Sequence, residues 1–138
     1  MNVQPYLMFN GRTEKAIDFY RKAVGAQVTA LMRFRDAPEP PPPGMIPDGW
    51  DDKIMHSSFK VGDAELMASD GCQSDGTGFA GISLALSVSS PEEADTKFAA
   101  LSEGGEVTMP LAQTFFSPRF GTLTDRFGVS WMIVTCAV

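Results

Sequence analysis

The side chain best suited to acid–base or metal chemistry is the single histidine of the chain, His56. It lies in a run of strand length, residues 54–59 (IMHSSF). One histidine excludes every site that needs two histidines from one chain. Three roles stay open for His56: a packing residue, a hydrogen-bonding group in a cleft, and a metal ligand or general base. A neutral imidazole can donate one hydrogen bond and accept another, which is enough for ligand recognition.

Nucleophilic and phosphate-binding chemistry have little support. Cys72 and Cys136 are 64 positions apart and form neither a CxxC pair nor a zinc pattern, so we expect two free thiols. The glycines of residues 71–81 are not followed by a helix with a Lys-Ser/Thr pair, which a phosphate-binding loop requires. Arg119 and Arg126 could clamp an anionic ligand, although two solvent-facing charges are the simpler interpretation.

Composition narrows the class of protein. The chain has 138 residues, with 11 Lys and Arg against 17 Asp and Glu and a formal net charge of −6. This charge repels phosphate backbones, so we do not expect nucleic-acid binding. A chain of this length can bury the core of one domain. No apolar run approaches the ~18 residues of a membrane span, and the first residues do not resemble a secretion signal. We therefore expect a cytoplasmic protein without membrane contact.

Two halves of the sequence repeat each other. Residues 25–29 (GAQVT) are echoed by residues 104–108 (GGEVT), and each copy follows a helical pattern. The first predicted helix has Thr13 as its N-cap, and the second has Ser90 as its N-cap with Pro91 at the first helical position. Short apolar runs precede and follow each helix, so both halves read β-α-β-β-β and the fold class is α+β. The predicted strands cover residues 5–9, 28–34, 53–61 and 65–69 in the first half, and 83–88, 106–109, 120–124 and 129–135 in the second.

Two segments interrupt the repeat. Residues 36–52 contain six prolines between positions 38 and 47, which excludes a helix or an inner strand. We expect a stiff projecting loop that ends in Met45, Ile46 and Trp50. It is either a variable hairpin excursion or a lid or partner-docking arm. The glycine-rich second segment, residues 71–81, reads as a linker between a module at 1–70 and a module at 82–138 within one domain.

Three motifs in order resemble the PhnB-like proteins of the vicinal oxygen chelate superfamily, which includes glyoxalases, bleomycin resistance proteins and extradiol dioxygenases. They are PYLMFNG with AIDFY at residues 5–20, LMASD at 66–70 and FGTLTDRFGVSWMI at 120–133. The resemblance implies two βαβββ modules with curved mixed sheets around a cleft, usually within a homodimer. The segment 116–119 (FSPR) departs from the family pattern at the cavity rim. Relatives are often labelled as ubiquinone-pathway methyltransferases, but no Gly-rich strand-to-helix turn is present to cradle an adenosyl cofactor.

The resemblance also implies where a divalent metal would be held, on the first and last strands of each module. The implied positions fall on Gln4 or Pro5, on Ser83 or Leu84, on Glu65, Leu66 or Met67, and on Met132. Met132 offers a thioether where a hard cation needs a carboxylate. Glu65 faces either the cleft or water. We therefore predict no cofactor and no metal, with His56 and Glu65 as weak candidate ligands.

The remaining positive feature is an apolar, sulfur-rich surface. Eight methionines and ten phenylalanines give a presumed cleft deformable walls, although some of them must belong to the core. The candidate residues of the ligand cleft are His56, Met67, Phe116, Phe120 and Met132. The leading hypothesis is a metal-free homodimer that binds a small, partly apolar molecule. The alternatives are a metal-dependent lyase, isomerase or dioxygenase with a non-standard site, and an interaction module that uses the proline-rich loop with Trp50.

Overall fold

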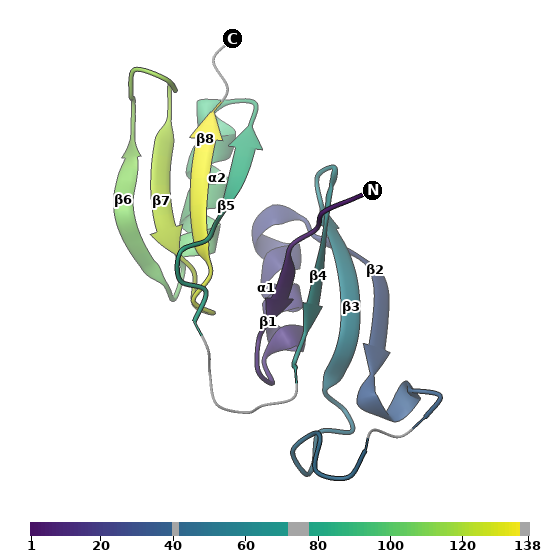
Figure 1. The fold of residues 1–138 in the computed structure, drawn as a ribbon. Helices are drawn as coiled ribbons and strands as arrows, with labels where there is room; N and C mark the ends of the chain where they lie inside the picture. Colours follow the sequence, from purple (N-terminus) through teal and green to yellow (C-terminus); the bar gives the residue numbers. More distant parts are fainter. Residues whose placement is uncertain (40–41, 72–77, 136–138) are drawn as a thin grey trace. The chain divides into compact units, whose positions relative to one another are not determined.

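Two units, each with one α-helix and four strands, make up the chain (Figure 1). The computed structural model describes residues 1–39, 42–71 and 78–135. The units are Met1–Thr77 and Gly78–Val138. Their boundary falls inside the segment 71–81 that the sequence predicts as a linker. Residues 72–77 of that segment, with Cys72, lie outside the described residues, as does Cys136.

The first unit folds into a mixed four-stranded sheet with a helix. Its elements are β1 (Tyr6–Met8), α1 (Thr13–Val24), β2 (Gln27–Arg33), the 3₁₀ turn η1 (Phe34–Asp36), β3 (Ile54–Val61) and β4 (Ala64–Ser69). The strand order is β1-β4-β3-β2, in which β1 and β4 are parallel and the other pairs are antiparallel. The α1 helix is the crossover that a parallel β-pair requires.

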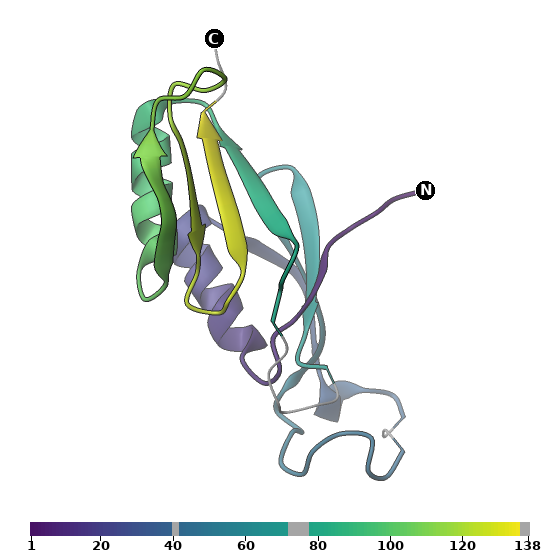
Figure 2. The same cartoon turned by 60° about the vertical axis from the view of Figure 1, so that its left-hand side comes forward.

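The second unit has the same topology. Its elements are β5 (Ser83–Val88), α2 (Pro91–Ser102), β6 (Glu106–Ala112), β7 (Phe120–Thr124) and β8 (Ser130–Thr135), and its strand order is β5-β8-β7-β6. In both views α2 runs along one face of this sheet (Figure 1, Figure 2). The predicted α+β fold of two βαβββ modules with mixed sheets is therefore confirmed. None of the helices in the described ranges is long and apolar enough to cross a membrane.

Each helix covers one face of its own sheet with an apolar stripe. In the first unit Tyr20 stacks on Phe59 of β3 with ring centroids 6.1 Å apart, and it also contacts Phe9. In the second unit Phe98 of α2 lies so close to Gly121 of β7 that a Cβ on that glycine would be 2.8 Å from the Phe98 ring. Because strand side chains alternate between faces, every second residue of each sheet is left on the face away from the helix.

The two helix starts differ in how well the sequence predicts them. The N-cap at Ser90 is confirmed, since its Oγ accepts a hydrogen bond from the Glu93 backbone N–H at 3.1 Å. The predicted N-cap at Thr13 is wrong: Arg12 occupies the N-cap position, where its side chain does not cap the helix, and Thr13 is the first, fully buried residue of α1. The Thr13 N–H donates instead to Asp70, at 2.9 Å.

The β6 strand is longer than the sequence predicts. It runs to Ala112 through Pro110, although we expected it to end at Met109. A proline lacks the N–H that an inner strand needs, but β6 is an edge strand. Its pairing with β7 is also irregular between Met109 and Ala112, so that a residue without an N–H is accommodated there.

Candidate functional site

The sheet face opposite α1 carries the polar candidates of the first unit. Tyr6 lies opposite Met67 in the parallel β1–β4 pair, and Met67 lies opposite Ser58 in the β4–β3 pair. His56 is two residues from Ser58 and so projects to the same side. We call this surface the open face of unit 1. His56 and Met67, two of the predicted cleft residues, therefore share a face.

His56 is hydrogen-bonded on this face. Its Nδ1 lies 3.0 Å from the Tyr6 hydroxyl, and the two rings are 5.8 Å apart between centroids. The hydroxyl donates when Nδ1 carries no proton and accepts when it does. Tyr6 was not among the predicted site residues, although strand alternation carries the signal: Leu7 is buried and its neighbour Tyr6 therefore lies on the other face.

Glu65 lies next to Gln4, the first-strand position implied for a metal ligand. The Gln4 side-chain amide donates to Glu65 Oε1 at 3.4 Å. Two oxygen donors are too few for a closed site of a hard cation, which takes six or more. Within the described ranges, no three His, Cys, Asp or Glu side chains gather into a group that could hold a metal ion. The residues of a single unit therefore do not fit the metal site that the superfamily suggests.

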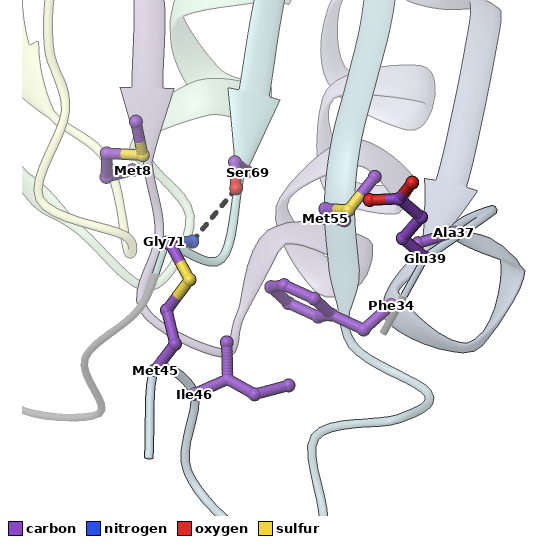
Figure 3. Close-up of a pocket in the computed structure, with 9 residues that line it drawn as sticks. All are labelled: Met8, Phe34, Ala37, Glu39, Met45, Ile46, Met55, Ser69 and Gly71. Atoms are coloured by element: carbon purple, nitrogen blue, oxygen red, sulfur yellow. Dashed lines mark hydrogen bonds between the residues drawn. The ribbon is translucent and has the colours of Figure 1, made fainter. Parts of the chain in front are cut away.

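A pocket of about 280 Å³ lies in the first unit, at the end of the sheet where β1 and β4 finish (Figure 3). Its walls come from β1, β3, the end of β4, η1 and the proline-rich loop. They are mainly apolar side chains. The lining residues are Met8, Phe34, Ala37, Glu39, Met45, Ile46, Met55, Ser69 and Gly71. Of these, Phe34 and Met55 belong to the phenylalanine and methionine set that the sequence singles out, and Met45 and Ile46 to the end of the predicted projecting loop.

The proline-rich loop is fastened to the unit at both ends. The Phe34 N–H donates to the Lys53 carbonyl at 3.0 Å, and the Arg35 N–H donates to the Asp51 carbonyl at 3.0 Å. Arg33, at the end of β2, pairs with Glu14 of α1 and also donates to the Asp52 carbonyl. Its hydrogen bond with Glu14 raises the pKa of Arg33 above the ordinary value, so the guanidinium stays charged.

Trp50 anchors the loop and is not an exposed contact residue. It is buried against Phe34, with ring centroids 6.4 Å apart, and Gly11 lies beside its ring. Trp50 is therefore not exposed to a partner in this structure, and the docking-arm interpretation of the loop stays a prediction. The indole ring has a large apolar surface, so folding the loop back onto the unit and burying the ring is more favourable than leaving it in water.

The base of the pocket is tied down by a buried carboxylate. Asp70, only 1% exposed, accepts hydrogen bonds from the backbone N–H groups of Gly11, Thr13 and Ile54 at 2.7–2.9 Å. The next residue, Gly71, donates to Ser69 Oγ at 2.9 Å, as drawn in Figure 3. The lining residues Ser69 and Gly71 are thus held next to a rigid junction of β3, β4 and the start of α1.

The other predicted cleft residues lie in the second unit. Phe116 packs edge-to-face on Phe120 with centroids 5.0 Å apart, and Phe115 packs on Phe116. Phe120 lies opposite Val134 of β8, and Met132 is two residues away on the same face. Phe116, Phe120 and Met132 thus belong to one side of this sheet, away from α2. The predicted cleft residues thus fall into two groups, one in each unit.

The two arginines considered as an anion clamp are engaged within the second unit. Arg119 pairs with Asp95 of α2 at 2.8 Å. The Arg126 Nε donates to the Glu103 carbonyl at 3.1 Å, at the end of the same helix. Arg119 thus contacts the first half of α2, and Arg126 contacts the residue that follows it. Two charges engaged at the surface describe these arginines better than an anion clamp.

The duplicated βαβββ topology and the open sheet faces define the vicinal oxygen chelate fold. A family model described as 3-demethylubiquinone-9 3-methyltransferase matches residues 1–134, and the chain belongs to this PhnB-like family. Protein YjdN of Escherichia coli (strain K12) is 33% identical to it, over 96% of this chain and 94% of that protein.

Solved structures agree with this assignment. The protein PA1353 from Pseudomonas aeruginosa is 42% identical with a TM-score of 0.85, covering 99% of this chain and 98% of that one. The putative 3-demethylubiquinone-9 3-methyltransferase, PhnB protein, from Bacillus cereus is 28% identical with a TM-score of 0.80, over 99% and 100% of the two chains. The fosfomycin resistance protein FosX from Listeria monocytogenes, solved with Mn(II) and sulfate, shares the fold at 9% identity (TM-score 0.63, 99% and 91% covered).

Proposed function

We propose that this protein binds a small, largely apolar molecule in the pocket between the proline-rich loop and the end of the first sheet. The observation that carries the proposal is the pocket itself, with Met8, Phe34, Met45, Ile46 and Met55 in its walls. Its volume of about 280 Å³ is near the lower end of the ~300–1,000 Å³ of ligand sites. Methionine side chains adapt to ligand shape because they are unbranched and polarizable.

Methyl transfer, which the family description names, is not part of this proposal. A dinucleotide or adenosyl group is usually cradled by a Gly-rich turn from a strand into a helix. The turn from β1 into α1 carries one glycine, Gly11, and the turn from β5 into α2 is Ser89-Ser90. These turns do not fit such a cofactor.

A ligand screen with matched methionine variants tests the proposal. We expect members of a broad metabolite library to raise the melting temperature of the wild-type protein and to be retained in native mass spectrometry. Met45→Ala should weaken the binding of a hit about fivefold, the effect of losing ~1 kcal/mol of apolar contact. Met109→Ala in β6 is the control, because Met109 is 50% exposed and Met45 51%, but Met109 lies outside the pocket. The proposal would be contradicted if no member of the library binds, or if the two variants change the affinity for a hit equally.

A metal-dependent reaction is the second candidate function, favoured by His56 and Glu65 lying on the same open face. His56 keeps Nε2 as a potential ligand while Nδ1 contacts Tyr6. A complete site would need further donors from another unit or another chain. Elemental analysis of gently purified protein should then find a stoichiometric divalent metal that is lost in His56→Ala. A wild-type protein that carries no metal and takes up none on dialysis against Ni²⁺, Zn²⁺ or Mn²⁺ would retire this candidate.

We also infer a cytoplasmic homodimer. The edge strands β2 and β6 expose Leu31, Val107 and Met109, and unpaired strand edges with apolar side chains favour pairing with another chain. Light scattering should give twice the chain mass of 14.9 kDa. A particle of single-chain mass at micromolar concentration would contradict the dimer.

A further inference from the structure

We propose that the pocket selects ligands whose positive charge is surrounded by apolar groups, and that the Glu39 carboxylate attracts this charge. This inference rests on the proposed function, because it concerns the same pocket. Glu39 is the one ionisable side chain among the lining residues that belong to the described ranges. In Figure 3 its carboxylate is directed toward Met55, another wall residue.

The charge of Glu39 is not neutralised by its neighbours. The basic residues that flank the loop have other partners: Arg33 pairs with Glu14, Arg35 pairs with Asp52, and Lys53 donates to the Gly11 carbonyl at 2.8 Å. No salt bridge to Glu39 occurs in residues 1–39, 42–71 and 78–135. A carboxylate beside an apolar pocket and without a cationic partner attracts a cation from solution.

The loop around the pocket adds further negative charge near Glu39. Residues 36–52 contain five acidic side chains and no Lys or Arg, in a chain whose formal net charge is −6. The acidic residues are Asp36, Glu39, Asp48, Asp51 and Asp52. Most of the excess negative charge therefore lies in the segment that contributes Ala37, Glu39, Met45 and Ile46 to the walls. Clustered charge of one sign raises the local concentration of oppositely charged ligands.

The walls define the kind of cation. A primary ammonium needs three hydrogen-bond acceptors, but the described walls offer few: the Ser69 hydroxyl already accepts from the Gly71 N–H, and the remaining side chains are apolar apart from Glu39. A quaternary ammonium needs no hydrogen bond. It can place its methyl groups against methionine and against the Phe34 ring, whose face attracts cations. We therefore assign hydrophobic quaternary or tertiary ammonium compounds as the ligand class.

Two probes of the same shape separate charge from apolar contact. Benzyltrimethylammonium and neopentylbenzene differ in one central atom, N⁺ or C, so only the first is charged. In a ligand-observed NMR titration at low salt, the wild-type protein should bind the cation about threefold to fivefold more tightly, the range expected for a solvent-accessible charge pair. The preference should fall toward unity at about 1 M salt, where charges more than a few ångströms apart are screened.

Two variants with the same change in net charge locate the effect. Glu39→Gln should remove the preference and leave the Kd of neopentylbenzene unchanged. Asp63→Asn, in the exposed turn between β3 and β4, should keep the preference. Equal binding of the two probes to the wild type, a preference that survives in Glu39→Gln, or an equal loss in Asp63→Asn would each overturn the role of Glu39. In those cases the binding of neopentylbenzene still supports the proposed function; if neither probe binds, the proposed function itself fails.

Discussion

The two units share one topology but differ in the connection between the second and third strands of each module. In the first unit this connection runs from Phe34 to Lys53 and supplies five of the described lining residues of the pocket. In the second unit it covers residues 113–119 and presents Phe115 and Phe116 to solvent. The sheet order is thus set by the duplicated pattern, whereas the site depends on an insertion that one copy has and the other lacks. A loop on a rigid sheet can change without cost to the core, which is why function concentrates there.

The units also differ in how each uses a buried aspartate. Asp70 accepts three backbone N–H groups from two segments, the start of α1 and the start of β3, which are 16 to 59 residues away in sequence. Asp125 accepts from the Phe127 and Val129 N–H groups and from the Trp131 indole, all within six residues. The first aspartate joins distant segments next to the pocket, and the second closes a local hairpin.

Removing either aspartate should have the largest effect on stability. Asp70→Ala leaves two buried donors and one part-buried donor without an acceptor, and Asp125→Ala leaves three buried ones. We expect each change to lower the free energy of unfolding by about 4 kcal/mol. Urea denaturation measures this, with the exposed Asp63→Ala as a control that should change by less than about 0.5 kcal/mol. Only Asp70→Ala should also weaken ligand binding in the pocket. A loss below about 1 kcal/mol for Asp70→Ala would contradict its role as a junction.

Replacing one aromatic side chain by alanine in each connection tests whether the loop of the first unit is more firmly packed than that of the second. Trp50→Ala should destabilise the protein by about 3 kcal/mol, because it empties a buried site against Phe34. Phe115→Ala should be nearly neutral, since Phe115 is fully exposed. Thermal unfolding of the two variants checks this. Equal shifts in Tm would show that the loop of the first unit is no better anchored than that of the second.

The first copy of the repeat has an alanine where the second has a glycine, and we expect the second copy not to tolerate the added methyl group. Ala26 precedes β2, and the matching position before β6 is Gly105. A Cβ on Gly105 would lie 2.2 Å from the Thr124 carbonyl oxygen, so Gly105→Ala should cost about 2 kcal/mol. Gly78→Ala serves as the control, because nothing lies within 4 Å of its Cβ. Chemical denaturation that finds the two alanine variants equally stable would refute the close contact.

The smallest expected effects concern the open sheet faces. Tyr6→Phe removes the hydroxyl that contacts His56, and Thr122→Val removes the 2.6 Å contact between the Thr108 and Thr122 hydroxyls. Both pairs are exposed, so each change should alter stability by less than about 1 kcal/mol. Tyr6→Phe should nevertheless shift the His56 ring signals in NMR, and Thr122→Val should not. Unchanged His56 signals in Tyr6→Phe would show that the hydrogen bond is absent in solution.

Predictions from the sequence succeeded where the physical cause is local. The start of α2 depends on Ser90, Pro91 and Glu93, which are adjacent, and the structure confirms it. The end of α1 also has a local cause, since Gly25 has a φ of 70°, a left-handed conformation that glycine adopts without strain. The N-cap at Thr13 failed because the acceptor for its N–H is Asp70, 57 residues away.

The candidate site was only partly predictable for the same reason. The sequence singled out His56 and Met67, but their shared face depends on the register of β3 and β4. Phe34 and Met55 were recognised as members of an apolar set, whereas nothing in the sequence brings Glu39 together with them. The burial of Trp50 was not predicted, because a run of prolines predicts a stiff projecting loop but does not tell which way the loop folds.

The sequence alone determined the duplicated βαβββ pattern, the helix boundaries that depend on neighbouring residues, and the family. These follow from hydrophobic period and turn chemistry, which act over a few residues. The tertiary structure decided which side chains form the pocket, how Asp70 joins three segments and why Trp50 is buried. Those contacts link residues far apart in the chain, and such contacts exist only after the strands have paired and the loop has packed.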